Sequence, residues 1–154
     1  MSFIKAKQHL EKFNLESRII EFNESTATVA LAALALGVTE GEIAKSLSFI
    51  VNDNPILVIV AGDRKIDNHK FKDEFTVKAK MIPFDEVEIL IGHAAGGVCP
   101  FGINEKVDVF LDISLKQYEY IYPACGTSNT AVKLTINDLE KASYYKKWVN
   151  VCKE

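Results

Sequence analysis

Apolar residues recur at intervals of three and four in three stretches of the chain, which predicts amphipathic helices there. These helices are expected to begin at Ser2, at Asp67 or Asn68, and at Pro83. A fourth stretch, ending at Gly37, is apolar on every side and predicts a largely buried helix. The apolar positions are Phe3, Ala6, Leu10 and Phe13 in the first helix, Phe71 and Phe75 in the second, Phe84, Val87 and Ile91 in the third, and Val29 to Leu36 in the fourth.

Strands are predicted where apolar residues alternate with polar ones or run without interruption. The clearest pair is a hairpin, in which residues 45–51 and 56–61 are joined by a turn at residues 52–55. Other predicted strands are residues 17–22, 76–81, 107–113, 119–124 and 130–136, and a capping box at Asn137 and Glu140 predicts a last helix. Six or seven strands mixed with four or five helices predict an α+β fold with a mixed, mainly antiparallel sheet.

Composition narrows the class of protein. The 154 residues suit one domain, residues 1–154, and 48% of them are hydrophobic, as in soluble globular proteins. The longest apolar run is too short to cross a membrane, and the first residues lack the apolar segment of a signal peptide, so a cytoplasmic protein without membrane contact is expected. The net charge of −3 does not indicate a nucleic-acid-binding protein, although residues 64–80 are locally basic.

Residues 91–102 form the most unusual stretch, because it holds four glycines and Pro100. Such a stretch cannot continue a helix or a regular strand. It is either a plain connector or a shaped loop whose backbone amides approach a ligand, and the glycines at 96 and 97 would allow that approach. A second small-residue turn, Gly126 to Asn129, offers hydroxyl, amide and backbone donors, or is simply a turn.

Lys45 lies on the same strand face as Leu47 and Phe49 if the side chains alternate. A buried lysine without a partner is costly, so either the side chain extends outward to solvent or it meets an anionic or carbonyl oxygen of a ligand.

His93 could cap the preceding helix or serve as a base, and with Cys99 it could form a nucleophile and base. The three cysteines form no CxxC pair, which favours reduced thiols and predicts no metal site.

Three segments taken together, residues 42–47, 92–102 and 126–134, resemble the family of YbaK and prolyl-tRNA synthetase-associated domains, which edit aminoacyl-tRNA. Lys45 falls on the strand lysine of that family, and Gly96 to Pro100 fits its Gly-x-x-x-Pro loop. The third segment matches less closely, because family members vary there. The resemblance covers nearly the whole chain and implies a barrel-like sheet surrounded by helices.

The resemblance further implies a trans-acting deacylase that hydrolyses the ester of a mischarged tRNA, typically proline tRNA carrying alanine, serine or cysteine. Its partners would be the 3′ end of the aminoacyl-tRNA and a prolyl-tRNA synthetase, with no metal or cofactor. The catalytic residue would be Lys45, and the substrate-binding residues would be Gly96, Gly97, Val98, Cys99, Pro100, Ser128, Asn129 and His93. Two alternatives stay open: a module that binds aminoacyl-tRNA or a nucleotide without turnover, and a Cys99/His93 thiol hydrolase.

Overall fold

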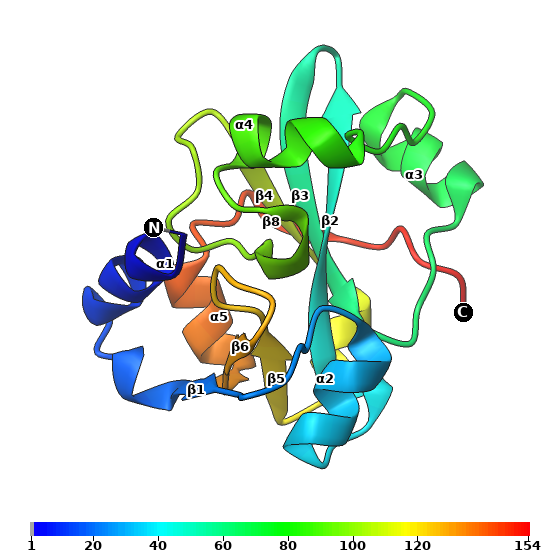
Figure 1. The fold of residues 1–154 in the computed structure, drawn as a ribbon. Coiled ribbons are helices and arrows are strands. Elements are labelled where there is room, and N and C mark those ends of the chain that lie inside the picture. Colours follow the sequence, from blue (N-terminus) through cyan, green and yellow to red (C-terminus); the bar gives the residue numbers. More distant parts are fainter. Residues whose placement is uncertain (1) are drawn as a thin grey trace.

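The computed structural model describes residues 2–154 and is built around a curled six-stranded sheet (Figure 1). The strand order is β7-β5-β2-β3-β4-β8, and a separate two-stranded sheet pairs β1 with β6. The strands are β1 (Ile19–Glu21), β2 (Ile43–Val51), β3 (Asn54–Ala61), β4 (Asp108–Asp112), β5 (Tyr120–Pro123), β6 (Thr130–Val132), β7 (Leu134–Thr135) and β8 (Lys147–Val149). The helices are α1 (Ser2–Glu11), α2 (Val29–Leu36), α3 (Asn68–Phe75), α4 (Val87–Ile91) and α5 (Ile136–Ala142).

The predicted hairpin is confirmed as the long antiparallel pair β2–β3, whose register runs from Ala44 opposite Ala61 to Val51 opposite Asn54. Both turn residues, Asn52 and Asp53, have positive φ, which these residue types tolerate better than most. The hairpin forms the centre of the sheet. It therefore determines where the residues of the predicted site lie.

The sheet is mixed, as predicted, but parallel neighbours are more frequent than the hairpin pattern indicated. The pairs β2–β5, β3–β4 and β4–β8 are parallel, and the pairs β2–β3 and β5–β7 are antiparallel. Parallel neighbours need a long crossover connection, and residues 62–107, with α3 and α4, supply one between β3 and β4. This crossover also contains residues 91–102, which we call the glycine-rich loop.

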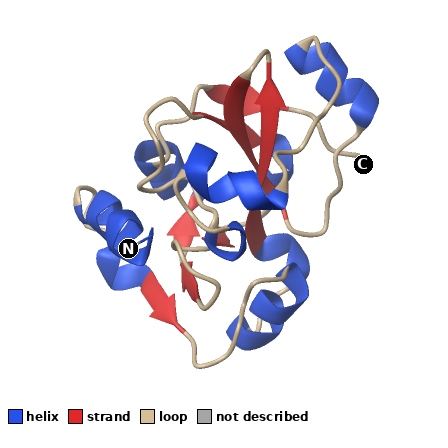
Figure 2. Cartoon of the chain, turned by 45° about the horizontal axis from the view of Figure 1, so that its top comes forward, coloured by secondary structure: helices blue, strands red, loops and turns tan. Residues whose placement is uncertain are grey.

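Two hydrophobic clusters cover opposite faces of the hairpin. Figure 1 shows α1 and α5 on one side of it and α3 on the other, and Figure 2 shows the helices grouped around the central strands. The larger cluster includes Leu57, Ile59 and Leu10, and the smaller one includes Val58 and Phe71. Alternate residues of β3 thus face different clusters, and the fully apolar second arm of the hairpin is buried on both faces, as predicted.

The prediction that α2 is largely buried is wrong. Only Ala32 and Ala33 of this helix are buried, whereas Leu34 is 81% exposed and Leu31 is 44% exposed. The helix does end at Gly37 in the left-handed conformation, and its cap is Thr28. A helix that is apolar all round gives no sign of which face meets the core, so exposure could not be read from it.

Several further predictions need correction. Residues 76–81 form no strand, and only an isolated bridge joins Met81 to Phe49. Phe84 is 82% exposed rather than part of the apolar face of α4. The last helix is capped by Thr135 together with Asp138, so its capping box lies two residues before the predicted one.

The strand predicted over residues 130–136 is divided into β6 and β7, which pair with different neighbours. Residues 147–149, for which the sequence pattern predicted no strand, form the edge strand β8. Within residues 2–154, no helix is long and apolar enough to span a membrane.

Candidate active site

A cavity of about 110 Å³ lies where β2, the start of α2, the glycine-rich loop and β6 meet, and we call it the Lys45 cavity. It brings together three residues of the predicted site: Lys45, Gly96 and Val98. The lining residues are Thr26, Ala27, Thr28, Val29 and Ala32 before and within α2, Ile43 to Ser46 on β2, Ala95, Gly96 and Val98 in the loop, and Tyr122, Ala124, Thr130 and Ala131 on or beside β5 and β6.

The glycine-rich loop is held by the second small-residue turn. After α4 ends at Gly92, with φ of 111°, the chain makes a short 3-10 turn over Ala95–Gly97. The carbonyl of Gly97 accepts a hydrogen bond of 3.1 Å from the amide of Gly126. A side chain at position 97 would collide with the backbone of Gly126 and Thr127. Two segments that are nearly thirty residues apart therefore form one wall, and glycine at position 97 is required by this close packing.

Backbone amides of the loop differ in what they can offer a ligand. The amide of Gly97 donates to the carbonyl of Ala94 at 2.9 Å, so it is occupied within the loop. Gly96 and Val98 both line the Lys45 cavity, which makes their amides the candidate donors. Pro100 has no amide hydrogen and is buried, and it lies outside the lining of this cavity.

The side chains of His93 and Cys99, two residues of the loop, are buried and do not line the cavity. Nε2 of His93 is 2.6 Å from the carbonyl oxygen of Phe101, so it must carry the proton and donate. Although Sγ of Cys99 is only 3.6 Å from the same nitrogen, that nitrogen has no free lone pair to accept a thiol proton. Both side chains are fully buried, and burial raises the pKa of the Cys99 thiol. This arrangement disfavours a thiolate nucleophile.

Burial also lowers the pKa of His93 below its ordinary value, with the hydrogen bond to Phe101 acting in the opposite direction. Within residues 2–154, Nδ1 of His93 is buried and has no hydrogen-bond partner. A protonated ring would place a second N–H there without an acceptor. His93 is therefore neutral and joins two ends of the loop through its bond to Phe101, which differs from both the helix cap and the base considered from the sequence.

Lys45 lies at the border between the Lys45 cavity and the smaller hydrophobic cluster. It is half-buried, and its cross-strand neighbour is Val60. Burial lowers the pKa of its ammonium group, while nearby Cys152 and Asp63 counteract part of that shift. No hydrogen bond or ion pair of the Lys45 side chain is found within the part of the chain that the structure describes. The ammonium group is thus partly desolvated and free to meet an anionic or carbonyl oxygen.

Ser46 is a site residue that the sequence reasoning passed over. The residue lines the Lys45 cavity, and its hydroxyl oxygen is fully buried with no hydrogen-bond partner among the described residues. A buried hydroxyl without a partner costs free energy unless a ligand or water supplies one. Its position next to Lys45 on β2 was the available signal, but a serine in a strand is too common to single out.

The turn at residues 126–129 contributes to the site in two different ways. Ser128 is exposed, and a Cβ atom added to Gly96 would lie 3.2 Å from its Cβ, which places Ser128 beside the loop. The side chain of Asn129 is instead bonded within the protein. Its amide nitrogen donates to the carbonyl of Phe22 at 3.0 Å, and its oxygen accepts from Thr127 at 2.9 Å. Asn129 therefore holds the turn together rather than lining the cavity.

The chemistry that this site offers is electrostatic. Lys45, Ser46, Gly96 and Val98 line a small space, and among the described residues no carboxylate lines it. Within residues 2–154, no three His, Cys, Asp or Glu side chains are grouped so that they could hold a metal ion. Such an arrangement can bind a carbonyl or phosphate oxygen and stabilise negative charge that develops on it.

Comparison with known proteins relates the chain to one protein family. A model of the "Aminoacyl-tRNA editing domain" family matches residues 23–142. The chain is 44% identical over its whole length to YwhH of Bacillus subtilis, an uncharacterised protein of which it covers 99%. It is also 26% identical over 128 residues to the proline–tRNA ligase of Bacillus licheniformis, and that match spans 75% of this chain and 22% of the ligase.

A solved structure described as a proposed trans-editing enzyme for prolyl tRNA synthetase superposes with a TM-score of 0.89 and 27% sequence identity, covering 99% of this chain and 98% of that one. This agreement confirms the predicted YbaK-like fold with its curled sheet. The chain spans only about a fifth of the ligase that it matches, so the similarity there concerns one part of a larger enzyme. The family match covers most of the chain, and the protein belongs to the aminoacyl-tRNA editing domain family.

Proposed function

We propose that this protein is a trans-acting aminoacyl-tRNA deacylase that hydrolyses the ester of proline tRNA mischarged with cysteine, alanine or serine. The observation that carries the proposal is the meeting of Lys45, Gly96 and Val98 in one small cavity. Membership of the editing family and the similarity to proline–tRNA ligases support it. The 154 residues would act as one editing domain in the cytoplasm, where charged tRNA is used.

The proposed reaction is attack of water on the ester carbonyl, which forms a tetrahedral intermediate with negative charge on the former carbonyl oxygen. The amides of Gly96 and Val98 would donate to that oxygen, and each such donor contributes about 3 to 4 kcal/mol where water is excluded. Collapse of the intermediate breaks the bond to the ribose oxygen and releases the amino acid. The ribose hydroxyl next to the ester would assist the water, because the cavity lining contains no carboxylate or histidine.

Lys45 would act by charge and position. Its half-buried ammonium group is not engaged in an ion pair within the described residues, so it can hold the terminal phosphate or the aminoacyl carbonyl. The hydroxyl of Ser46 would then supply a hydrogen bond to the bound ester or to its attacking water, which would satisfy its buried oxygen.

The size of the cavity supports a preference for small amino acids. A space of about 110 Å³ accommodates a side chain of a few atoms. A synthetase pocket rejects a slightly smaller amino acid by only about 1 to 3 kcal/mol, so a second, smaller site is needed to remove such errors. Editing in trans would serve a prolyl-tRNA synthetase, which is the proposed partner.

The test is a deacylation panel with proline tRNA charged with alanine, serine, cysteine or proline. We expect hydrolysis of at least one of the three small mischarged forms, with proline spared. Lys45→Ala should lower kcat/KM by about a hundredfold, as expected for loss of a charge in a desolvated site. Lys141→Ala, which removes an exposed charge on α5, is the matched control and should leave kcat/KM within about twofold.

Other outcomes would contradict the proposal. Absence of hydrolysis on all three small substrates, or a Lys45→Ala variant as active as wild type, would refute the assigned activity or the assigned role. Tight binding of aminoacyl-tRNA with an unchanged ester lifetime would instead favour the non-catalytic binding module.

A further inference from the structure

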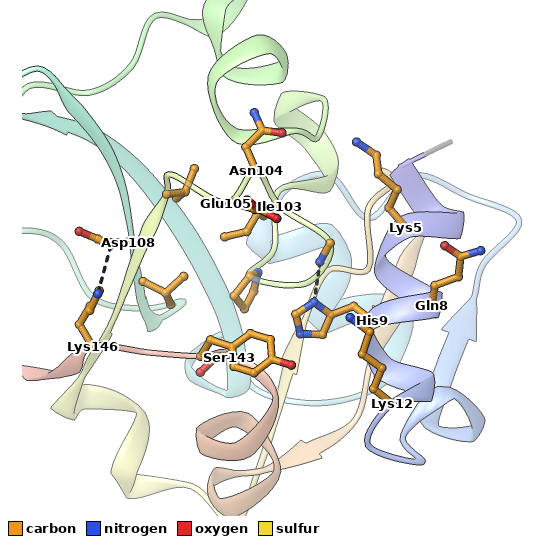
Figure 3. A pocket seen from close by; sticks show the side chains of 15 residues that line it. Lys5, Gln8, His9, Lys12, Ile103, Asn104, Glu105, Asp108, Ser143 and Lys146 are labelled. Carbon is orange, nitrogen blue, oxygen red and sulfur yellow. Dashed lines mark hydrogen bonds and ion pairs between the residues drawn. The ribbon is translucent and has the colours of Figure 1, made fainter.

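A second and larger cavity lies on another part of the molecule, and we call it the α1 cavity (Figure 3). Its volume is about 590 Å³, within the range of small-molecule binding sites. Its walls are α1, residues 100–109, which include the end of the glycine-rich loop, and residues 143–146 after α5. None of the residues that line the Lys45 cavity lines this one.

His9 joins the three walls. The amide of Gly102 donates to Nδ1 of His9 at 3.0 Å, so this nitrogen is unprotonated. Nε2 must then carry the proton, and it donates to the carbonyl of Ala142 at 2.6 Å. Burial lowers the pKa of His9, which keeps the ring neutral. Both ring nitrogens of His9 are therefore bonded to backbone groups of the protein, and these two bonds hold the walls of the cavity together.

Positive charge is concentrated on the α1 side of the cavity. Lys5 and Lys12 are seven residues apart, which places them on the same face of the helix, and Figure 3 shows both at this wall. The ammonium of Lys5 donates to the carbonyl of Gly92 at 3.4 Å, which leaves its charge uncompensated. On the opposite wall, Lys146 and Asp108 form an ion pair at 3.7 Å, and the acidic residue Glu105 also lines the cavity, on the wall formed by residues 100–109. An anionic group would therefore bind at the α1 side.

Ser143 supplies a polar group that lacks a protein partner. The residue is 1% exposed, and its hydroxyl oxygen is buried without a hydrogen-bond partner among the described residues. It lines the α1 cavity next to Tyr144. A rotation of the Ser143 side chain would bring this oxygen to a ligand hydroxyl in the cavity, and the new bond would remove the free-energy cost of leaving it unpaired.

Tyr144 supplies an aromatic surface at the mouth of the cavity. Its backbone has a φ of 51°, an unfavourable conformation for a bulky residue, and the residue is 63% exposed. The centre of its ring is 5.2 Å from that of His9 and 5.8 Å from that of Phe13, so it is supported from behind. An exposed, supported aromatic ring is a surface on which a nucleic-acid base can stack.

We infer that the α1 cavity binds a nucleotide. The base would stack on Tyr144, the ribose hydroxyls would reach the hydroxyl of Ser143, and the phosphate would lie between Lys5 and Lys12. This assignment matches an aromatic ring, an unpaired hydroxyl and two uncompensated ammonium groups with the three parts of one ligand. The nucleotide is either a free mononucleotide or a nucleotide within a tRNA chain.

The α1 cavity lies near enough to the Lys45 cavity for one bound tRNA to reach both. Gly96 lines the Lys45 cavity, and Gly102, six residues later in the same loop, lines the α1 cavity. Six residues span at most about 22 Å, so one nucleic-acid strand can reach both cavities. Binding of a nucleotide within tRNA rests on the proposed editing function. Binding of a free mononucleotide does not, because it requires no hydrolysis.

The experiment is titration of the ¹⁵N-labelled protein with AMP, CMP and inorganic phosphate, followed through the backbone amide signals of Gly102 and Tyr144. We expect saturable shifts at both signals with the mononucleotides and much weaker binding of phosphate alone. Tyr144→Asn removes the ring while keeping a residue type that tolerates positive φ, and it should weaken mononucleotide binding by about tenfold. Lys12→Gln should weaken it several-fold, whereas Lys7→Gln, an exposed position on α1 outside the cavity, should not.

A second arm measures binding of uncharged tRNA as a function of salt. If the ligand is a nucleotide of tRNA, Tyr144→Asn weakens tRNA binding, CMP competes, and Lys12→Gln lowers the salt slope by about one. If the ligand is a free nucleotide, tRNA binding is equal in all variants while the titration persists. The inference is overturned if no mononucleotide gives saturable shifts at millimolar concentration, or if Lys12→Gln and Lys7→Gln behave alike. Because the titration involves no ester, its failure is distinguishable from failure of the proposed hydrolysis.

Discussion

His93 is neutral because its protonated form would be buried with an unpaired N–H, and this has a consequence for stability. Its pKa in the folded protein is below the ordinary value of 6.5, which applies to the unfolded chain. As the pH falls below 6.5, the unfolded state therefore binds the proton more readily than the folded state does. The contribution of His93 to the free energy of unfolding is fully present above that pH and decreases on acidification.

We expect the stability difference between wild type and His93→Gln to be larger at about pH 7.5 than at about pH 5. Glutamine can still donate to the carbonyl of Phe101 but does not titrate. The difference should shrink by at most about 1.4 kcal/mol per pH unit in the window below the ordinary histidine pKa. Urea denaturation at the two pH values measures it, and a difference that stays constant would show that His93 protonates equally in both states.

Cys99 is the residue for which the structure most sharply separates the two enzyme hypotheses. Its thiol is fully buried, and the nearby His93 nitrogen is a donor. Cys99→Ala should therefore keep kcat/KM for deacylation within about twofold of wild type, with a loss of stability of about 1 kcal/mol from the small void. Single-turnover deacylation measures this. A loss comparable to that of Lys45→Ala would instead support the thiol hydrolase.

Some residues of the site could be predicted from the sequence, and others could not for physical reasons. Lys45 could be identified because a charged residue within an apolar strand face is unusual. Ser46 could not, because only the fold shows that its hydroxyl is buried without a partner. The family resemblance implied a binding role for Asn129, whereas both ends of its side-chain amide are bonded within the protein. Contacts between distant segments decide such roles, and they leave no local pattern.

Among the elements, the contact between the glycine-rich loop and the turn at residue 126 provides a matched pair of substitutions. Gly97→Ala places a Cβ against the backbone of Gly126, so it should lower the free energy of unfolding by about 1 to 3 kcal/mol. Gly96→Ala meets the Cβ of Ser128 at 3.2 Å and that of Ala27 at 3.5 Å, but no backbone closer than 3.9 Å, and should fold normally. Because it would partly fill the Lys45 cavity, we expect Gly96→Ala to lower deacylation about tenfold or more.

Thermal denaturation and deacylation of both variants test this separation. A Gly96→Ala variant with full activity would show that the cavity wall at this position does not contact the substrate. A Gly97→Ala variant as stable as wild type would mean that the turn moves away at little cost.

Helices and strands were predictable where one contiguous segment of the sequence determines them. The hairpin β2–β3 was predictable because both strands and the turn are contiguous. The strand expected over residues 76–81 has suitable alternation but finds no partner beyond one bridge at Met81. The edge strand β8 was missed because its three residues form a strand only by pairing with β4. Strand formation is a property of two segments, and the pattern of one is insufficient.

On the scale of the whole molecule, Asp112 connects distant parts of the chain. Asp108 and Asp112 are the first and last residues of β4, but the side chain of Asp108 is 47% exposed whereas Asp112 is 1% exposed. One of its carboxylate oxygens accepts a bond of 2.9 Å from the amide of Ser114, and the other accepts one of 2.8 Å from the amide of Val151. Asp112 thereby attaches the segment after β8 to the end of β4.

Asp112→Ala should lower the free energy of unfolding by about 2 to 5 kcal/mol, because it leaves two buried amides unpaired. Asp108→Ala is the matched control on the same strand. It removes only a partly exposed ion pair with Lys146 and should change stability by less than about 1 kcal/mol. Chemical denaturation of the two variants measures both effects, and similar losses would contradict the bridging role of Asp112.

The pairing of β8 with β4 also bears on when the protein becomes functional during its synthesis. The sheet acquires its last strand, and the carboxylate of Asp112 its second partner, only through residues 147–151. A nascent chain on the ribosome can form the hairpin early, since its strands are adjacent, but it cannot complete the sheet until these residues have left the exit tunnel. The editing domain therefore cannot complete its fold before these residues emerge, and a ribosome stalled before residue 147 would carry an incompletely folded chain.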